Sequence, residues 1–394
     1  MEKTKKLKLF ISYSHKDEPY IDEFRKHIVP LKNNGLIEDW YDRKILPGKD
    51  YQKEIDNNLE DADIICLFIS ANFLSSDSCQ EEKKKALELR KKRGTQVILI
   101  IVSPCAWQDD EDISNLHLLA LPTDGKPISS FKDQNEAWLN VYKGLKGVIE
   151  EEIKITQLKI KKGFEIFLQD VEVLTKAHSQ KETVFLDDIF VPPDLVAYEE
   201  LREFDRKINF KELLENFSDY PKTVIAGEGQ SGKTTLCKVI FKELRKRNFV
   251  PVYVVDKKHK FSGKIENRIS RAFAEQYEGI DINEIDPERI IPIIDDFHLA
   301  KNKEKHIKDL FKYSHCILIV DDIFALNVKD DKLISSFAYF KINEFKPSLR
   351  YELIRKWVSL TDKEKKEIEV YQHIDKTIEL IDSTLGRIFG KGIM

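Results

Sequence analysis

Within residues 1–150, short apolar runs alternate with stretches whose apolar residues recur every three to four positions. Four such runs predict strands: 6–14, 36–42, 63–70 and 96–103. Helical spacing of the apolar residues predicts helices that begin near Glu18 and cover 52–62 and 81–94. Strands that alternate with helices predict a parallel sheet with helices on both faces.

The second half of the chain repeats this α/β pattern after an interruption. Residues 150–179 read as a highly charged helix, and the paired prolines Pro192 and Pro193 then break the pattern. Four apolar runs predict further strands: 222–227, 250–255, 289–296 and 316–322. We therefore expect an α/β domain at 1–150, a helical or extended linker at 151–200, a second α/β domain at 201–340 and a helical subdomain at 341–394. The last would be truncated if the sequence is a fragment.

Composition indicates a multidomain protein with real hydrophobic cores. A length of 394 residues exceeds one ordinary domain, and 41% of the residues are hydrophobic. The net charge of -4 argues against a dedicated nucleic-acid or anionic-membrane surface. The five cysteines form no CxxC pair, and no apolar run approaches the length of a membrane span. These features predict a cytoplasmic protein with reduced, buried thiols.

The stretch GEGQSGKT, residues 227–234, matches the phosphate-loop pattern G-x-x-x-x-G-K-[ST] in full. In such a loop the backbone N–H groups converge on the phosphates, and the lysine reaches the β and γ phosphates. A predicted strand precedes the loop and a predicted helix follows it, so the helix dipole adds to phosphate binding. The loop residues expected to bind ATP are Gly227, Gly229, Ser231, Gly232, Lys233, Thr234 and Thr235.

A Mg²⁺ site beside this loop also needs an acid at the end of a neighbouring strand. Asp295 and Asp296 end the apolar run 289–296. We expect Asp295 to hold Mg²⁺ together with the hydroxyl of Thr234, and Asp296 to help position the attacking water. Two acids at a strand end are also common in α/β proteins without this role. The phosphate loop favours the catalytic interpretation, so both acids join the expected ATP site.

The loop and the acid pair together resemble a P-loop NTPase of the STAND (NACHT-like) type, whose members use nucleotide state to control assembly. The resemblance implies that the helical region with Phe345 and Trp357 is a lid on the nucleotide. Asp321 and Asp322 end a run similar to the sensor strand of such folds. The sensor arginine is not assigned, and three arginines near in sequence are candidates: Arg350, Arg355 and Arg387.

The first 150 residues carry a different set of motifs. In chain order these are LFISYSHKDE, WYDRKILPGKDYQKEI, ADIICLFISANFLSSDSC, EKKKAL and LPTDGKPISSFKDQNEAW. Their combination resembles a bacterial Toll/interleukin-1 receptor (TIR) domain over about residues 6–150. The resemblance implies a flavodoxin-like fold. TIR domains are either adaptors that stack on one another or enzymes that separate nicotinamide from ADP-ribose in NAD.

The enzymatic TIR domains carry a glutamate in the first turns of the helix after the third strand, and this position is Glu82 here. Nicotinamide is a cationic leaving group in NAD and needs no general acid. A fixed carboxylate near the ribose would stabilise the oxocarbenium-like transition state. No GxGxxG motif occurs in this half, so NAD binding would not be Rossmann-like. The residues expected to contact NAD are Ser12, Tyr13, Trp40, Asp42, Arg43 and Cys79.

Glu82 also has a purely structural interpretation. The stretch SSDSCQEE is a helix N-terminal pattern in which Ser78 would cap the helix and Glu81 would take the capping-box position. Acids in a first turn are favoured by the helix dipole whatever their function. The family often has an aromatic residue just before the cysteine, where this chain has Ser78. The side chain that stacks on nicotinamide would then be Tyr13, Trp40 or Tyr41.

Residues 42–50 form the loop through which TIR domains contact one another, unless they are simply an exposed Pro-Gly turn. A TIR domain that needs a neighbour's loop is active when clustered, and a tethered NTPase that assembles with ATP would supply that clustering. We therefore expect an NAD⁺ glycohydrolase activated by ATP-dependent self-association, similar to bacterial TIR–STAND antiphage proteins. The alternatives are a TIR adaptor switched by the NTPase and a cyclase that makes a cyclic ADP-ribose messenger. No sensor region is recognisable, and a phage component is one candidate trigger.

Overall fold

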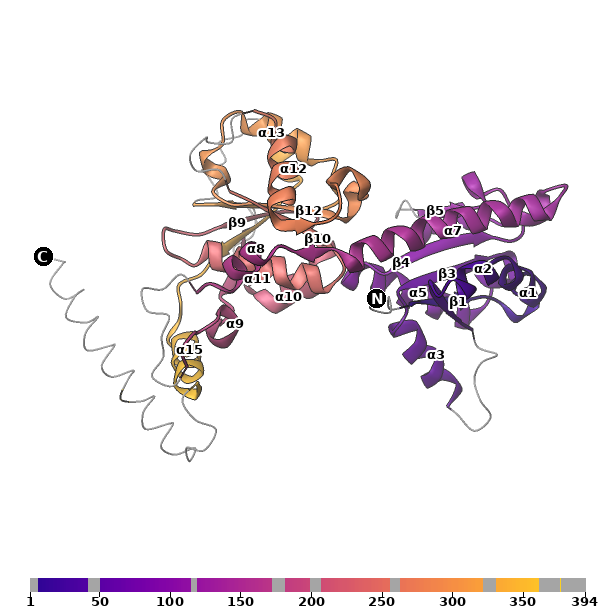
Figure 1. Cartoon of the computed structure of the whole chain (residues 1–394), viewed down its shortest axis with the longest axis horizontal. Coiled ribbons are helices and arrows are strands. Elements are labelled where there is room, and N and C mark those ends of the chain that lie inside the picture. Colours follow the sequence, from indigo (N-terminus) through magenta and orange to yellow (C-terminus); the bar gives the residue numbers. More distant parts are fainter. Residues whose placement is uncertain are drawn as a thin grey trace, which may run out of the picture. The chain divides into compact units, whose positions relative to one another are not determined.

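The computed structural model of this chain describes residues 6–41, 50–114, 119–171, 181–198, 207–255, 263–321, 331–360 and 376. The chain divides into two compact units. The first comprises Met1–Leu158 with Arg247–Phe249, and the second comprises Lys159–Lys246 with Val250–Met394. The colours of Figure 1 follow the sequence, from indigo in the first unit to yellow at the end of the second.

A five-stranded parallel sheet in the order β2-β1-β3-β4-β5 forms the centre of the first unit. Its strands are β1 (Leu7–Ser12), β2 (Ile37–Trp40), β3 (Ile64–Ile69), β4 (Gln96–Ile101) and β5 (Leu119–Leu121). Each of the four predicted runs contains one of these strands. The order is that of flavodoxin-like folds, so the predicted fold class is confirmed for this unit.

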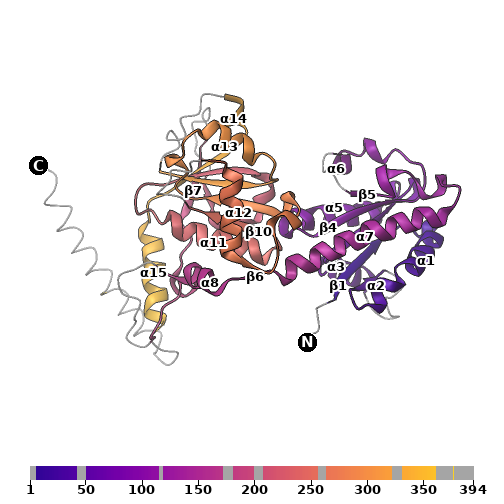
Figure 2. The ribbon, with the colours of Figure 1, turned by 45° about the horizontal axis from the view of Figure 1, so that its top comes forward.

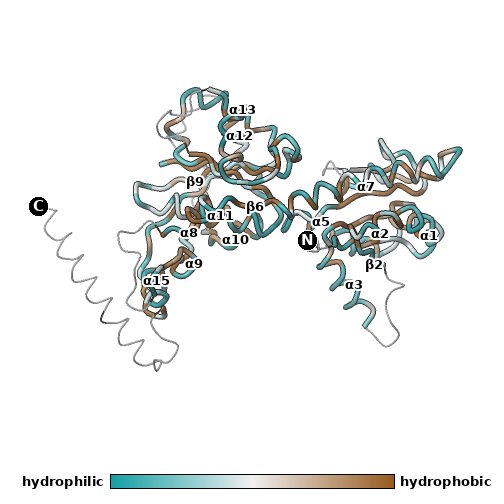
Figure 3. Tube along the Cα trace, viewed as in Figure 1, coloured by the Kyte–Doolittle hydropathy of each residue, from teal (hydrophilic) through white to brown (hydrophobic). Residues whose placement is uncertain are grey.

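Helices cover both faces of this sheet because both faces of its strands are apolar. The helices are α1 (Glu18–His27), α2 (Val29–Asn33), α3 (Tyr51–Glu60), α4 (Ala71–Leu74), α5 (Asp77–Arg93), α6 (Glu111–Ser114) and α7 (Gln134–Gln157). Leu9 and Ile11 of β1 belong to the core cluster with α1, α2 and α7, whereas Phe10 belongs to the cluster with α3, α4 and α5. Figure 3 accordingly colours the central strands mainly as hydrophobic.

The second unit is built on a seven-stranded sheet in the order β10-β12-β13-β9-β14-β7-β8. Its strands are β7 (Asp194–Tyr198), β8 (Lys207–Asn209), β9 (Lys222–Ala226), β10 (Val250–Val254), β12 (Ile290–Ile294), β13 (Cys316–Val320) and β14 (Ala338–Ile342). Strands β10, β12, β13, β9 and β14 pair in parallel. Strands β7 and β8 add an antiparallel edge beside β14. A separate small sheet pairs β6 (Lys159–Ile160) with β11 (Tyr277–Glu278).

Helices of the second unit flank this sheet (Figure 2). They are α8 (Lys162–Gln169), α9 (Leu186–Ile189), α10 (Phe210–Glu215), α11 (Lys233–Lys246), α12 (Ile265–Gln276), α13 (Lys303–Leu310), α14 (Asp331–Ser335) and α15 (Pro347–Ser359). In the region 341–394, which was expected to be a helical subdomain, β14 ends at Ile342 and α15 follows. After α15 the structure describes only Leu360 and Lys376, so Arg387 lies outside the described residues.

The segment expected to be a linker, 151–200, contains ordered elements of both units. Helix α7 continues past residue 150 to Gln157, because apolar residues at Ile149 and Ile155 keep one face buried. The second unit then begins with β6 and α8 and continues through α9 to β7. Leu186, the first residue of α9, and Val191, which follows this helix, are both buried, so this part of the chain packs as core although paired prolines follow it.

Candidate nucleotide-binding sites

A cavity of about 360 Å³ opens at the carboxyl ends of the strands of the first sheet. Its walls come from the segment after β1, the end of β2, the start of α3, the segment after β3 and the first turns of α5. In open parallel sheets ligands bind at this edge, where the strand order reverses, and here the reversal lies between β1 and β3. The position and size of the cavity are those of a small-molecule site.

Glu82 reaches this cavity from the inward face of α5. The buried residues of that helix are Cys79, Lys83, Ala86 and Leu87, at the spacing of one helical face. Glu82 lies on the same face, one turn after Cys79, and is half-buried. A carboxylate at such a position is unusual, because this stripe of a helix ordinarily carries apolar side chains.

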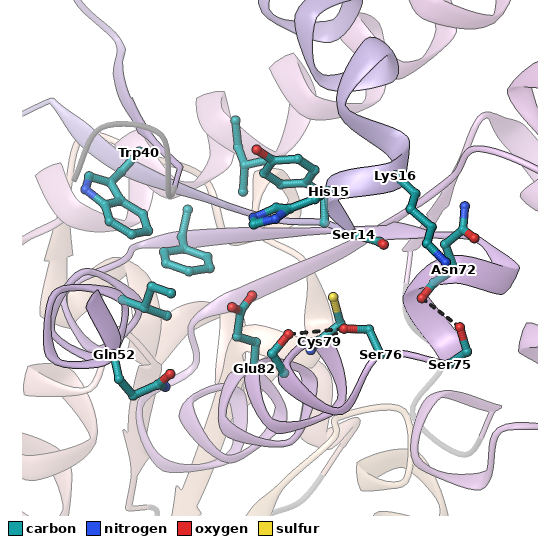
Figure 4. Close-up of a pocket in the computed structure, with 15 residues that line it drawn as sticks. Ser14, His15, Lys16, Trp40, Gln52, Asn72, Ser75, Ser76, Cys79 and Glu82 are labelled. Atoms are coloured by element: carbon teal, nitrogen blue, oxygen red, sulfur yellow. Dashed lines mark hydrogen bonds between the residues drawn. The ribbon is translucent and has the colours of Figure 1, made fainter. Parts of the chain in front are cut away.

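The carboxylate of Glu82 is held by the end of β1. The hydroxyl of Ser12 donates a hydrogen bond of 2.5 Å to Glu82 Oε2. In Figure 4 the carboxylate points up into the cavity, with Trp40 and His15 on either side of it. Trp40 stacks on Phe10 with ring centroids 5.1 Å apart, which fixes its indole at the cavity wall.

A buried hydrogen-bond network joins the two loops above the cavity. Asp17 is 5% exposed and accepts hydrogen bonds from Ser70 Oγ at 2.5 Å and from Asn72 Nδ2 at 2.9 Å. Ser70 Oγ in turn accepts from the backbone of Phe73 at 3.0 Å and caps α4. The sequence analysis missed this network, although its carboxylate and its cap residue both lie in the motifs quoted for the family. It fixes the segment after β1 against the segment after β3, and so fixes Asn72 at the wall of the cavity.

The start of α5 differs from the prediction. Ser76, and not Ser78, is the N-cap, and its hydroxyl accepts from the backbone N–H of Cys79 at 3.5 Å. Ser78 therefore lies inside the first turn, where its hydroxyl is 3.1 Å from that of Ser76. Burial is the largest cause that raises the pKa of the Cys79 thiol to about 11, so this cysteine stays protonated at neutral pH.

The structure brings together most of the residues that were expected to contact NAD. Tyr13, Trp40 and Cys79 line the cavity, and Ser12 contacts Glu82 directly beneath it. Tyr41 is absent from the cavity lining and packs against the guanidinium of Arg25, 4.4 Å from its ring centroid. Asp42 and Arg43 lie outside the described residues.

In the second unit the phosphate loop joins the carboxyl end of β9 to the start of α11. Gln230 and Gly232 adopt positive φ angles of 66° and 86°, so the backbone curls back on itself before the helix begins at Lys233. A Cβ placed on Gly227 would lie 2.4 Å from Ser231 Oγ, so a larger residue here would displace that side chain. Backbone N–H groups at the start of α11 form the anion-binding end of the helix.

Lys233 folds back over the loop. Its ammonium donates to the carbonyls of Gly227 at 2.7 Å and Glu228 at 2.9 Å, and it forms an ion pair with Asp321 at 2.9 Å. Asp321 follows β13, the strand between β9 and β12. The ammonium thus lies at the mouth of the loop, where an incoming phosphate would exchange for these oxygens.

Thr234 and Asp295 meet at the carboxyl edge of the sheet. Thr234 Oγ1 donates to Asp295 Oδ2 at 3.0 Å, and the hydroxyl of Tyr253 donates to the same oxygen at 2.7 Å. Asp295 is 1% exposed, and this burial is the main cause that raises the pKa of its carboxyl. A hydroxyl and a carboxylate oxygen are ligands that suit Mg²⁺. Tyr253 was missed by the sequence analysis because its partner is 42 residues away.

Asp296 and His298 add polar groups beside this pair. Asp296, at a positive φ of 54°, His298 and Asp321 place one potential ligand atom each within 4.8 Å of one another. His298 Nε2 lies 3.0 Å from Asp321 Oδ2, so Asp321 contacts both His298 and Lys233. The ammonium beside Asp321 disfavours a further cation there while Lys233 keeps this position.

A larger cavity, of about 800 Å³, lies beside the phosphate loop. Gly229, Ser231, Gly232 and Thr235 of the predicted site line it. The opposite wall comes from the segment around α9 and from Phe345 before α15. Part of the expected linker therefore forms a wall of the candidate nucleotide site.

Comparison with known proteins assigns the first unit. Residues 9–134 match the TIR domain family, and this part of the chain is a TIR domain. A curated relative, the uncharacterized protein y4lF of Sinorhizobium fredii, is 40% identical over 139 residues, which are 35% of this chain and 42% of the relative. The chain thus matches less than half the length of that relative.

Solved structures resemble each unit in part. The TIR domain of the Toll-related receptor TRR-2 from Hydra magnipapillata aligns with 35% of this chain and 97% of its own, at 17% identity and a TM-score of 0.26. AMPPCP-bound DnaA from Aquifex aeolicus aligns with 46% of this chain and 63% of its own, at 20% identity and a TM-score of 0.29. The P-loop NTPase fold of the second unit is defined by its own parallel sheet and by the loop between β9 and α11.

Two further expectations concern the whole chain. All five cysteines are free, and all but Cys105 are buried. Among the residues that the structure describes, none of the helices combines the length and the apolar character needed to cross a bilayer.

Proposed function

We propose that the TIR unit is an NAD⁺ glycohydrolase and that the second unit binds ATP and Mg²⁺ to control self-association. The observation that carries this proposal is the carboxylate of Glu82, which is half-buried on the inward face of α5 and held by Ser12 at a cavity. An acid with only a helix-dipole role would sit as well on the exposed side of the first turn, where Asp77 lies.

The arrangement suits loss of a leaving group that is already cationic. The bond between the ribose carbon C1′ and the nicotinamide nitrogen breaks, and its electron pair leaves with nicotinamide. Positive charge then spreads over the ribose ring, and a carboxylate such as that of Glu82 stabilises it. Water adds to C1′ and loses a proton, giving ADP-ribose. The cavity suits the nicotinamide-riboside end of the substrate, and Trp40 offers a fixed aromatic wall.

The second unit supports the regulatory half of the proposal. Lys233 at the mouth of the phosphate loop and the pair of Thr234 and Asp295 suit a nucleotide triphosphate with its Mg²⁺. Nucleotide binding would release Lys233 from Asp321 and favour an assembling state, which raises the local concentration of TIR units. This design agrees with a cytoplasmic TIR–STAND antiphage protein that exhausts NAD after a trigger, which could be a phage component.

An NAD-consumption assay on the full chain, with and without ATP and Mg²⁺, tests the proposal. We expect wild-type protein with ATP to release nicotinamide, and Glu82→Gln to be slower by a hundredfold or more. Glu81→Gln is the matched control, because Glu81 is exposed on the neighbouring position of the same helix and should leave the rate unchanged.

Separation of the products distinguishes the remaining possibilities. ADP-ribose as the product supports hydrolysis of NAD. A cyclic product would show that the TIR unit is a cyclase instead. Intact NAD in the presence of ATP and of cross-linked TIR units would instead make the unit an adaptor and contradict the proposal. Equal loss of activity in both glutamate variants would remove Glu82 from the active site.

A further inference from the structure

A second cavity of the second unit has no part in the function proposed above. It has a volume of about 360 Å³ and lies between α8, the end of β10 and α12. None of its lining residues belongs to the phosphate loop or to the 800 Å³ cavity beside that loop. Figure 2 shows α8, β10 and α12 in the same part of the second unit.

One wall of this cavity is aromatic and fixed in place. Phe164 and Phe167 are three residues apart on α8, and so share a face of that helix. Their rings stack with centroids 5.4 Å apart. Phe164 packs edge-on against Phe241 of α11 at 5.2 Å, and the ammonium of the buried Lys238 lies 4.3 Å from the centre of the Phe167 ring.

The opposite wall carries two guanidinium groups. Arg268 and Arg271 are three residues apart on α12 and line the cavity together. Arg271 pairs with Glu275 at 2.9 Å, but their side chains are 72% and 64% exposed. An ion pair as exposed as this one contributes little stability, so an anionic ligand exchanges readily for Glu275. Two guanidiniums on one helix face match the geometry of a phosphate group.

Backbone contacts hold the two walls at a fixed separation. Strand β6, directly before α8, pairs with β11, directly after α12. Lys161 adds two hydrogen bonds across the same junction, from its backbone N–H to Gln276 O at 2.8 Å and from its ammonium to Ala274 O at 2.6 Å. The cavity is therefore preformed, which lowers the entropic cost of binding a ligand.

Tyr253 forms the floor of the cavity and connects it to the nucleotide site. Its ring lies 5.4 Å from that of Phe167, and its backbone N–H and carbonyl are both bonded to the side chain of Gln276. Its hydroxyl donates to Asp295 Oδ2 at 2.7 Å. A ring stacked in the cavity would hold Tyr253 in the position from which it donates to Asp295.

We propose that this cavity is a second ligand site, for a small planar aromatic anion of the size and chemistry of a nucleoside monophosphate, coupled through Tyr253 to the Mg²⁺ acid Asp295. The ring stacks on the aromatic wall, where base–aromatic contacts contribute about 1–3 kcal/mol each. The anionic group binds Arg268 and Arg271. Only the coupling rests on the proposed nucleotide site, and the binding itself does not. A ligand in this cavity strengthens the binding of Mg²⁺·ATP. By thermodynamic linkage, Mg²⁺·ATP strengthens the binding of that ligand by the same factor.

Calorimetric titration of AMP into the full chain with Lys233→Ala, which disables the phosphate loop, tests the binding. We expect saturable binding that Arg268→Gln with Arg271→Gln weakens at least tenfold, whereas Lys264→Gln, at the exposed N-cap of α12, leaves it unchanged. Adenosine lacks the anion and ribose 5-phosphate lacks the ring, so each should bind at least tenfold more weakly. Absence of AMP binding, or equal binding by the double variant, overturns the site. An adenylate oligonucleotide that binds more than tenfold tighter than AMP overturns the assignment to a free small molecule.

Titration of ATP and Mg²⁺ into the protein with an intact Lys233, with and without AMP, tests the coupling. AMP should strengthen ATP binding by about fivefold, a typical coupling between sites. If AMP competed with ATP at the phosphate loop, it could only lower the affinity for ATP. A higher affinity for ATP in the presence of AMP therefore identifies the second site. Tyr253→Phe keeps the ring and removes the hydroxyl that donates to Asp295, and should abolish the increase. A coupling that survives in Tyr253→Phe overturns the route through Tyr253. Neither titration measures NAD, so failure here is separate from failure of the NADase proposal.

Discussion

Glu82 is held in position by Ser12, a residue 70 positions away at the end of β1. Replacing Ser12 by alanine removes this donor and weakens the restraint on the carboxylate. A hydrogen bond to a charged group contributes about 1.5–3 kcal/mol, so we expect Ser12→Ala to lower kcat for NAD cleavage about tenfold. Steady-state nicotinamide release measures the effect.

Two comparisons separate this positioning role from general damage. Ser12→Ala should be less severe than Glu82→Gln, because the charged group remains. Ser12→Thr keeps the hydroxyl and should recover most of the lost rate at unchanged thermal stability. A rate for Ser12→Ala equal to that of the wild type would mean that the bond has no catalytic importance.

His315 is a second residue whose environment has a measurable consequence. It stacks on Phe217 with ring centroids 4.8 Å apart, and burial, with a smaller contribution from the charge of Lys222, lowers the pKa of His315 to about 4. The unfolded chain takes up a proton near pH 6.5, whereas the folded chain takes it up only near pH 4. The stability from the neutral ring is therefore complete above about pH 6.5 and is lost as the pH falls toward 4.

The prediction compares His315→Phe, which keeps a ring against Phe217, with the wild type. Between pH 7 and pH 5 the wild type should lose up to about 2 kcal/mol more unfolding free energy than the variant. Chemical denaturation at the two pH values measures this difference. A parallel loss in both proteins would show that His315 does not titrate in this range.

At the scale of elements, the phosphate loop offers a matched pair of glycines. A Cβ on Gly227 would lie 2.4 Å from Ser231 Oγ and 3.1 Å from Ile342 Cδ1, whereas a Cβ on Gly229 would meet nothing within 4 Å in the described part of the chain. In Gly227→Ala, Ser231 Oγ and Ile342 Cδ1 must therefore move away from the added methyl group. We expect Gly227→Ala to weaken binding of Mg²⁺·ATP at least tenfold and Gly229→Ala to change it less than about threefold. Titration calorimetry of both variants decides, and equal affinities would contradict the crowding at Gly227.

The elements that could be predicted from the sequence are those buried on both faces. Strands such as β3 and β13 are continuous apolar runs, because a parallel sheet covered by helices excludes water from both sides. The antiparallel edge was missed, since β7 is short and follows paired prolines. Strand β14 was not among the predicted strands, because its alternating pattern extends over only five residues.

The residues of the candidate sites likewise divide into those that local sequence patterns predict and those that they do not. The phosphate loop and Asp295 follow from local patterns, whereas Glu82 was singled out through the family resemblance. Contacts such as Tyr253 with Asp295 join distant segments and could not be predicted from local pattern. The cap of α5 shows a smaller limit, since Ser76 and Ser78 have equal capping propensity and tertiary packing of Cys79 selects the first.

At the scale of the whole molecule, the chain joins a TIR unit to a P-loop unit, each with its own core and its own cavity. The described residues that line the cavity at Glu82 all belong to the first unit. In the proposed function, a neighbouring copy completes the site, so a single chain should cleave NAD slowly. Because the proposed role of ATP is to bring copies of the chain together, ATP should act by raising the local concentration of TIR units.

The last prediction follows from that dependence. With ATP and Mg²⁺, the rate of NAD cleavage per molecule should rise with protein concentration, because each added copy completes a site in its neighbour. Lys233→Ala removes the ammonium that contacts Gly227, Glu228 and Asp321, and should leave the rate per molecule low and independent of concentration. Chemical cross-linking of the Lys233→Ala protein should restore activity, since the TIR unit is unchanged. If dilute wild-type protein cleaves NAD as fast per molecule as concentrated protein, each TIR unit holds a complete site, and the P-loop unit must act by another route than proximity.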